Sequence, residues 1–239
     1  WGQAGMVNFG LAGFFGVGAY TAAILLVRGV DVFTATAAAV VVTALVSAIV
    51  ATASIKLRED YLAITTLAFA EAVRIVALNE EWLTGGSNGI ANIPRPLVAV
   101  VGGQNYELVF LAIVVAAVAI VYVILEALVR SPFGRALRAI RDDDIVAATL
   151  GKNVLSLRMK AFAVGGAVIG LAGALHAYYL SYIDPGQFAG FVTVYAFMAV
   201  IAGGKGSNLG LVIGACTVMV LLEGSRFLKD LLPWMTAQQ

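Results

Sequence analysis

The feature that most constrains this chain is a series of long apolar segments separated by short polar ones. Apolar stretches occupy approximately residues 4–27, 32–55, 61–78, 108–129, 161–183, 188–202 and 211–222. An α-helix needs about 20 apolar residues to cross a bilayer. Only 12% of the residues are charged, whereas a soluble domain has about 25%. The sequence therefore predicts an all-α, polytopic transmembrane helical bundle. A net charge of +1 argues against a nucleic-acid partner, which requires a basic surplus.

Not all of these stretches are ordinary spans. The first two, the fourth and the fifth are long enough to cross a membrane, whereas the third contains Glu71 and Arg74. The last two are short and are separated by "GGKGSNLG". Short or glycine-broken segments are typical of discontinuous helices that line a transport pathway, although a short span with little tilt fits the sequence equally well.

Glycines spaced four residues apart predict close helix packing. They are Gly166 and Gly170 in one stretch, and Gly206, Gly210 and Gly214 in another. Without side chains at these positions two helix backbones approach closely, which is a major source of helix association in membranes. We expect a tightly packed bundle.

The distribution of basic residues predicts the orientation. With alternating spans, the segments 56–60, 130–160 and 203–210 share one side and together contain ten Lys and Arg residues. The segments on the opposite side contain four. Because short cytoplasmic loops are enriched in Lys and Arg, we expect the 130–160 loop to be cytoplasmic.

The segment "SPFGRALRAIRDDDIVAATLGKN", residues 131–153, is the charged centre of that loop. Ser131 and Pro132 form a typical helix start, a capping side chain followed by proline in the first turn. The aspartates Asp142, Asp143 and Asp144 suit the N-terminus of a second helix, and Gly151 suits its end. The sequence predicts two short amphipathic helices joined by an acidic turn.

The first of these helices has two chemically different faces. The apolar stripe consists of Phe133, Leu137 and Ile140, and the basic face of Arg135, Arg138 and Arg141. An apolar patch surrounded by charge is typical of a surface that another protein covers. A solvated hairpin that only satisfies the charge bias is the alternative.

Other polar residues are candidates for a substrate path. They are Thr65, Thr66, Glu71, Arg74, Gly203 and Gly204, with the glycine-rich segment 10–18. Charged residues inside a span are costly and are usually paired, so a structural ion pair is the simpler interpretation of Glu71 and Arg74. His176 is interpreted as a packing residue. No catalytic constellation or metal-ligand cluster is recognisable in the sequence.

Several motifs occur together and in one order along the chain. They are "GQAGMVNFGLAGFFGVGAYTAA", "LREDYLAITTLAFAEAVRIV", "LTGGSNGI", "SPFGRALRAIRDDDIVAATLGKN" and "GGKGSNLGLVIGA". As a set they resemble the LivM-type permease of bacterial branched-chain amino acid ABC importers. The resemblance implies a single permease domain over residues 1–239 with a coupling loop at 130–160. The missing initiator Met fits an expectation that the domain is truncated at both ends.

The resemblance also implies partners and a role for the loop. Expected partners are a second, LivH-type permease, two cytoplasmic ATPases that bind ATP and magnesium, and a periplasmic substrate-binding protein, all at the bacterial inner membrane. The chain itself would be a transport subunit without enzymatic activity or cofactor. The segment from Gly134 to Gly151, including Ala148, would be the coupling-helix region that docks on an ATPase. A urea or short-chain amide permease and an ion-coupled secondary transporter are the alternatives.

Overall fold

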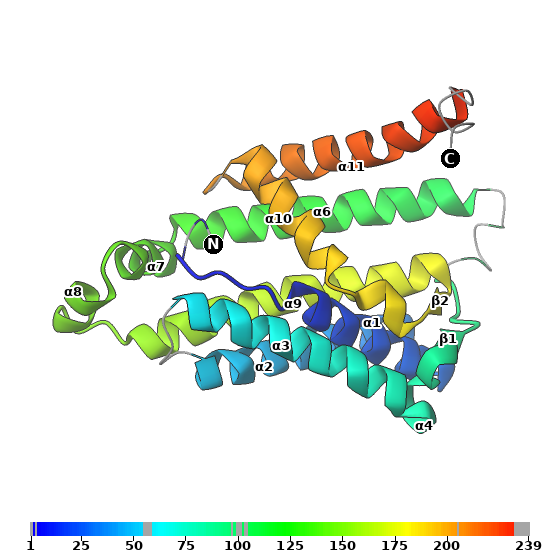
Figure 1. Cartoon of the computed structure of the whole chain (residues 1–239), viewed down its shortest axis with the longest axis horizontal. Helices are drawn as coiled ribbons and strands as arrows, with labels where there is room; N and C mark the ends of the chain where they lie inside the picture. Colours follow the sequence, from blue (N-terminus) through cyan, green and yellow to red (C-terminus); the bar gives the residue numbers. More distant parts are fainter. Residues whose placement is uncertain are drawn as a thin grey trace, which may run out of the picture. The chain divides into compact units, whose positions relative to one another are not determined.

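The computed structural model describes residues 2, 4–54, 59–96, 98, 102, 105–204 and 206–231 (Figure 1). The long helices are α1 (Leu11–Val27), α2 (Val32–Ser54), α3 (Glu59–Asn79), α6 (Tyr106–Arg130), α9 (Val154–Leu180), α10 (Phe191–Gly203) and α11 (Asn208–Leu231). The short elements are α4 (Glu81–Thr84), η1 (Gly86–Asn88), β1 (Ile90–Ala91), α7 (Pro132–Asp142), α8 (Asp144–Thr149), β2 (Tyr182–Ile183) and η2 (Pro185–Phe188).

The predicted helical membrane bundle is confirmed. Within the described residues, α2, α3, α6 and α9 are long and apolar enough to cross a membrane, and α10 with α11 passes as a bent pair. The third stretch therefore qualifies as a span despite its two charges. The chain divides into two compact units, one up to Val192 and one from Thr193 onward.

The first unit is built around α1, α2 and α9, which pack on one another along their length. Its glycines lie at the contacts: a Cβ on Gly18 would lie 2.6 Å from the Cα of Gly170, and one on Gly166 would lie 2.5 Å from the Cβ of Ser47. The predicted packing role of Gly166 and Gly170 is therefore confirmed. Dispersion contacts between closely spaced backbones stabilise these helix pairs.

The first predicted span is shorter than expected. Helix α1 begins only at Leu11, whereas residues 5–10 have no regular structure. The amide of Phe9 donates to the hydroxyl of Thr66 on α3 at 3.0 Å, and a Cβ on Gly10 would lie 2.8 Å from the carbonyl oxygen of Thr66. Residues before Leu11 thus bond to α3 instead of forming a further turn of α1. Apolar composition alone does not predict this contact.

The two ends of the first unit differ in structure. Helices α7 and α8 lie at one end, and α4, β1 and β2 lie at the other (Figure 1). Strands β1 and β2 pair antiparallel, with Ile90 opposite Ile183 and Ala91 opposite Tyr182. The segments after α3 and after α9 are thereby joined at the end opposite the charged loop, in agreement with the predicted alternation of spans.

The second unit contains a sharp reversal. Helices α10 and α11 are bent by 119° at the break between Gly203 and Asn208. A Cβ on Gly210 would collide with the carbonyl of Gly203, and one on Gly214 with that of Ala199. Gly206 departs from the predicted glycine series, because it lies in the connecting turn with φ of +94°. Helix α11 is also longer than the predicted stretch.

Candidate functional site

The candidate site is the α7–α8 loop, which begins with a well-formed helix cap. Ser131 is the N-cap of α7 and its side chain accepts from the amide of Gly134 at 3.5 Å, with Pro132 in the first turn. A Cβ on Gly134 would collide with the carbonyl of Val129, the last turn of α6. The lack of a side chain at Gly134 therefore lets α7 fold back closely against the end of α6.

The apolar stripe of α7 faces the chain's own interior. Leu137 is 7% exposed and Ile140 is 3% exposed, while Phe133 is half-buried. Helix α7 packs on α6, α8 and α9, and a Cβ on Gly5 would lie 2.8 Å from Cγ of Arg141. The expectation that this stripe forms the outward knob of the loop is corrected: the stripe attaches α7 to the bundle, because α6 and α9 already cover it.

All three arginines bond within the chain, and two of them bond to the end of α6. The guanidinium of Arg135 donates to the carbonyl of Arg130 at 3.2 Å, and that of Arg138 to the carbonyl of Val129 at 3.1 Å. These are last-turn carbonyls of α6, which lack intrahelical partners and form the negative end of the helix dipole. Arg135 and Arg138 therefore tie α7 to α6.

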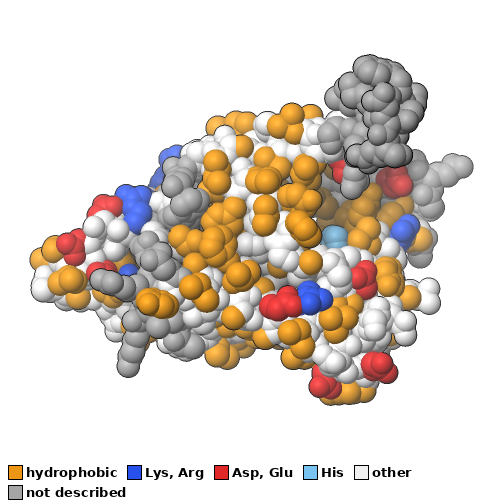
Figure 2. Space-filling model, in the orientation of Figure 1, with side chains coloured by type: hydrophobic (Ala, Val, Ile, Leu, Met, Phe, Trp, Pro, Cys, Tyr) orange, Lys and Arg blue, Asp and Glu red, His pale blue; other side chains and the backbone are white. Residues whose placement is uncertain are grey.

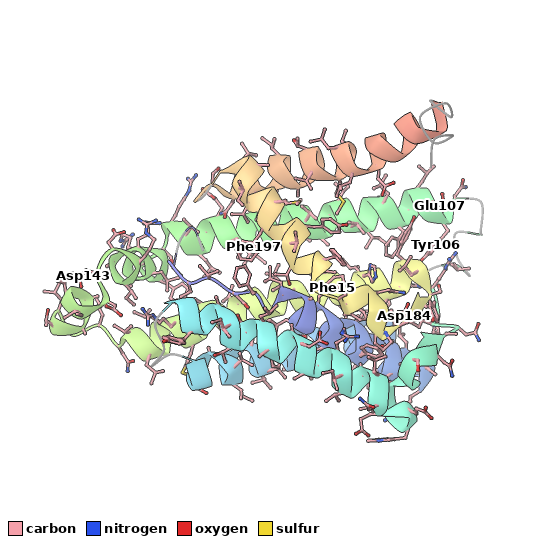
Figure 3. All side chains as sticks on the ribbon, in the orientation of Figure 1. Phe15, Tyr106, Glu107, Asp143, Asp184 and Phe197 are labelled. Atoms are coloured by element: carbon pink, nitrogen blue, oxygen red, sulfur yellow. The ribbon has the colours of Figure 1, made fainter. Side chains whose placement is uncertain are left out.

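The three aspartates have three separate positions. Asp142 is the last residue of α7 and pairs with Arg141 at 2.8 Å. Asp143 lies at the junction (Figure 3) and is the N-cap of α8, accepting from the amides of Ile145 and Val146 at 2.9 Å each. Asp144 begins α8 and pairs with Arg158 of α9 at 3.1 Å. The predicted second helix start is confirmed for Asp143 and Asp144.

Helix α8 is terminated as predicted by Gly151, which follows the C-cap residue Leu150. The amide of Gly151 donates to Ala148 at 3.0 Å and that of Lys152 to Ala147 at 3.1 Å, with a φ of +76° at Gly151. This is a Schellman motif, in which a left-handed glycine closes the helix. Ala148 is exposed on α8, whereas Ala147 is buried.

The outward apolar surface of the loop lies on α8 instead of α7. Ile145 is 74% exposed, Val146 53% and Leu150 74%. Hydrophobic side chains are visible at this tip of the molecule in Figure 2, beside acidic and basic ones. The apolar stripe predicted from the sequence does not include these three residues. The signal available in the sequence was the presence of these three large apolar residues in the short segment between the capping Asp143 and Gly151.

The candidate path residues on α3 fall into two groups. Thr66 is buried, accepts from Phe9 and donates back to Leu62 or Ala63 at 2.9 Å. Thr65 donates back to the carbonyl of Tyr61 at 2.8 Å. Both hydroxyls are thus engaged within the chain, a common behaviour of threonine in membrane helices.

Glu71 and Arg74 form the expected ion pair. The Nε atom of Arg74 donates to a Glu71 oxygen at 2.9 Å, and the side chains of Arg74 and Glu71 remain 29% and 51% exposed.

The two candidate path glycines lie in the other unit. Gly203 lies against the backbone of Gly210, and Gly204 occupies the turn with φ of +87°. The structure thus gives the two glycines a place in helix packing and chain reversal.

His176 has the contacts of a packing residue. Its Nε2 lies 3.1 Å from Oε1 of Gln187, and Nε2 of Gln187 donates to Asp184 at 2.8 Å. The imidazole centroid lies 5.1 Å from the ring of Phe15 and 6.3 Å from that of Phe188. Phe15 and Asp184, two residues of this group, are labelled in Figure 3. The contacts join η2 to α1 and α9.

These features define a multi-pass helical membrane protein with a structured, charged loop at one end. Residues 1–236 match the family described as branched-chain amino acid transport system / permease component. The chain belongs to this family of permease components.

Three curated relatives illustrate the similarity. The high-affinity branched-chain amino acid transport system permease protein LivM of Salmonella typhimurium is 31% identical over 93% of this chain and 58% of that protein. The probable LivM permease of Methanocaldococcus jannaschii is 37% identical over 73% of this chain and 51% of the relative. The LivH permease of Salmonella typhimurium is 30% identical over 65% of this chain and 46% of the relative.

The chain thus spans between about half and three fifths of the length of the LivM proteins that it matches. No solved structure matches it.

Proposed function

We propose that the chain is the permease subunit of an ATP-driven ABC importer that moves branched-chain amino acids across a bacterial inner membrane. Membership of the permease family and the likeness to LivM proteins support the transport role. The single observation that supports energy input from a cytoplasmic partner is the α8 surface, where three large apolar side chains are exposed on a capped helix.

The proposed partners follow from this role. A LivH-type permease completes the membrane part, two cytoplasmic ATPases bind ATP and magnesium, and a periplasmic protein delivers the substrate. The likeness of this chain to LivH as well as LivM supports a pair of related permease subunits.

The geometry of the loop suggests how work enters the bundle. An ATPase would contact the exposed residues of α8, while α7 is tied to α6 through Arg135, Arg138 and its buried stripe. Asp144 connects α8 to Arg158 of α9. A movement of the ATPases would therefore displace α6 and α9 together. Packed helices respond to such a displacement by discrete shifts, which would change the side of the membrane to which the transport pathway is open.

Reconstitution tests the function. The permease pair, its ATPases and its receptor are placed in proteoliposomes, and uptake of labelled leucine is measured with and without ATP. We expect uptake that requires ATP and persists when an ionophore collapses the proton gradient. Uptake that follows the proton gradient without ATP would assign the chain to secondary transporters, and ATP-driven uptake of urea or acetamide but not leucine would overturn the substrate assignment.

A further inference from the structure

An irregular segment before α1 lies at membrane depth. Residues 5–10 form neither helix nor strand (Figure 1), and the amide of Phe9 donates to the hydroxyl of Thr66 on α3 at 3.0 Å. Thr66 lies inside the segment Tyr61–Asn79 that is long and apolar enough to cross a membrane. Its distance from the start of that segment is about 8 Å along the helix axis. Phe9 therefore lies at a depth at which lipid chains surround the bundle.

Contacts along its length hold this segment in place. A Cβ on Gly5 would lie 2.8 Å from Cγ of Arg141 on α7. Met6 is 8% exposed and packs in one cluster with Leu62 of α3 and Phe162 of α9. The segment thus runs from α7, at the charged end of the unit, to α3, and its position is fixed by tertiary contacts.

The polar groups of this segment are nevertheless unpaired. Within the described part of the chain, no hydrogen bond involves the backbone of Gly5, Met6 or Val7. The side chain of Asn8 accepts from the amide of Gly10 at 2.8 Å, but its own NH2 group has no partner among the described residues. Val7 and Asn8 are half-buried. Successive residues of the segment thus present free amide and carbonyl groups.

Neither lipid nor a further helix can pair these groups. A polar backbone group without a partner is costly in hydrocarbon. The backbone of any helix that packs on the segment, from this chain or another, is already paired within that helix. Irregular backbone at membrane depth occurs where protein groups pair it or where it borders a water-filled cavity. Because the described chain supplies no such protein groups, the segment is suited to face water.

Helix α6 shows the contrast within the same chain. Its backbone is helical from Tyr106 to Arg130, and between Glu107 and Glu126 it has no charged residue. Val115, near the middle of the helix, is 59% exposed. A paired backbone with an apolar exterior is stable in lipid. Helix α6 therefore serves as a reference for a lipid-facing element.

We propose that residues 5–8 line a water-filled part of the transport pathway, on the side of the membrane at which α7 and α8 lie. The free amides would donate to the carboxylate of a passing amino acid, and the free carbonyl groups would accept from its ammonium group. The inference rests on the proposed function, because it takes a zwitterionic amino acid as the substrate that crosses.

Cysteine labelling of the importer in lipid nanodiscs tests the position of the segment. Cys216→Ala removes the native thiol, and one cysteine is introduced as Val7→Cys, as Asn8→Cys or, as the matched control, as Val115→Cys. A charged thiosulfonate reagent that does not enter lipid is added without nucleotide or with ATP and vanadate.

The reactive thiolate forms in water and not in hydrocarbon. We therefore expect labelling at positions 7 and 8 at least about tenfold faster than at 115 in one or both nucleotide states. The attached charged group should also abolish leucine uptake when it is at position 7. Labelling at either position that is no faster than at 115 in both states would overturn the proposal.

Hydrogen–deuterium exchange of the unmodified importer tests the same point without a substitution. We expect the amides of residues 5–8 to exchange at the rate of an unstructured peptide in water, and those at the centre of α6 to be strongly protected. Strong protection of residues 5–8 would show that polar groups of another protein segment pair them, and this would overturn the proposal.

The proposed function and the proposed pathway fail in different experiments. If the unmodified importer shows no ATP-dependent uptake of leucine, the proposed function fails. If it transports leucine but residues 5–8 are protected from both exchange and the reagent, the function stands and the assignment of this segment to the pathway falls.

Discussion

Helices α7 and α8 are neighbours in one loop, yet they use their apolar residues in opposite ways. Helix α7 buries Leu137 and Ile140 in its own chain and bonds through Arg135 and Arg138 to the end of α6. Helix α8 exposes Ile145 and two further large apolar side chains. The comparison separates two parts of the loop: α7 attaches it to the bundle, and α8 carries the exposed apolar surface that we propose binds a partner.

The largest expected effect comes from the joint between α6 and α7. Gly134→Ala places a Cβ against the carbonyl of Val129, a clash with backbone that cannot rotate away. We expect a loss of more than about 3 kcal/mol in the free energy of unfolding, measured by denaturant titration in micelles. Gly165→Ala is the matched control, since a Cβ there meets no atom within 4 Å; equal losses in both variants would contradict a tight joint.

Truncation of one leucine in each helix sharpens the comparison. Leu137→Ala in α7 creates a cavity and should lower the free energy of unfolding by about 2 kcal/mol, the lower end of the range for a buried leucine, because the end of the bundle can relax. Leu150→Ala in α8 removes an exposed side chain and should change stability by less than about 0.5 kcal/mol. Similar losses at both positions would show that the two helices are equally buried.

A smaller effect is expected at the cap between the helices. Asp143→Ala removes the acceptor of two backbone amides and should cost about 1 kcal/mol. Asp142→Ala, one residue earlier, loses only an exposed ion pair and should cost less than about 0.5 kcal/mol. Thermal unfolding of the two variants side by side provides the check, and a reversed order would contradict the cap assignment.

Local signals in the sequence were sufficient for the loop's secondary structure. The roles of Ser131, Asp143 and Gly151 depend on hydrogen bonds within a few residues, so the helix limits follow from the residue types alone. The membrane spans are similarly predictable, because length and apolar composition decide whether a helix can cross.

Tertiary contacts account for what the sequence did not reveal. The inward stripe of α7 depends on α6 folding back at Gly134, and the late start of α1 depends on the bond between Phe9 and Thr66. The sequence favoured Arg135 and Arg138 as docking residues, because the neighbouring residues do not indicate that the last carbonyl groups of α6 lie within hydrogen-bonding distance of them. Docking on an ATPase stays a prediction, with α8 now its main surface.

Co-purification of the ATPases with a variant of α8 tests that surface most directly. Ile145→Asp with Leu150→Asp makes the exposed face polar without touching the buried stripe of α7, and Trp82→Asp changes a 78% exposed apolar residue at the opposite end of the unit. With equal amounts of folded permease, we predict at least about tenfold less bound ATPase for the α8 variant and no loss for Trp82→Asp. Full recovery of the ATPases with the α8 variant would contradict the account.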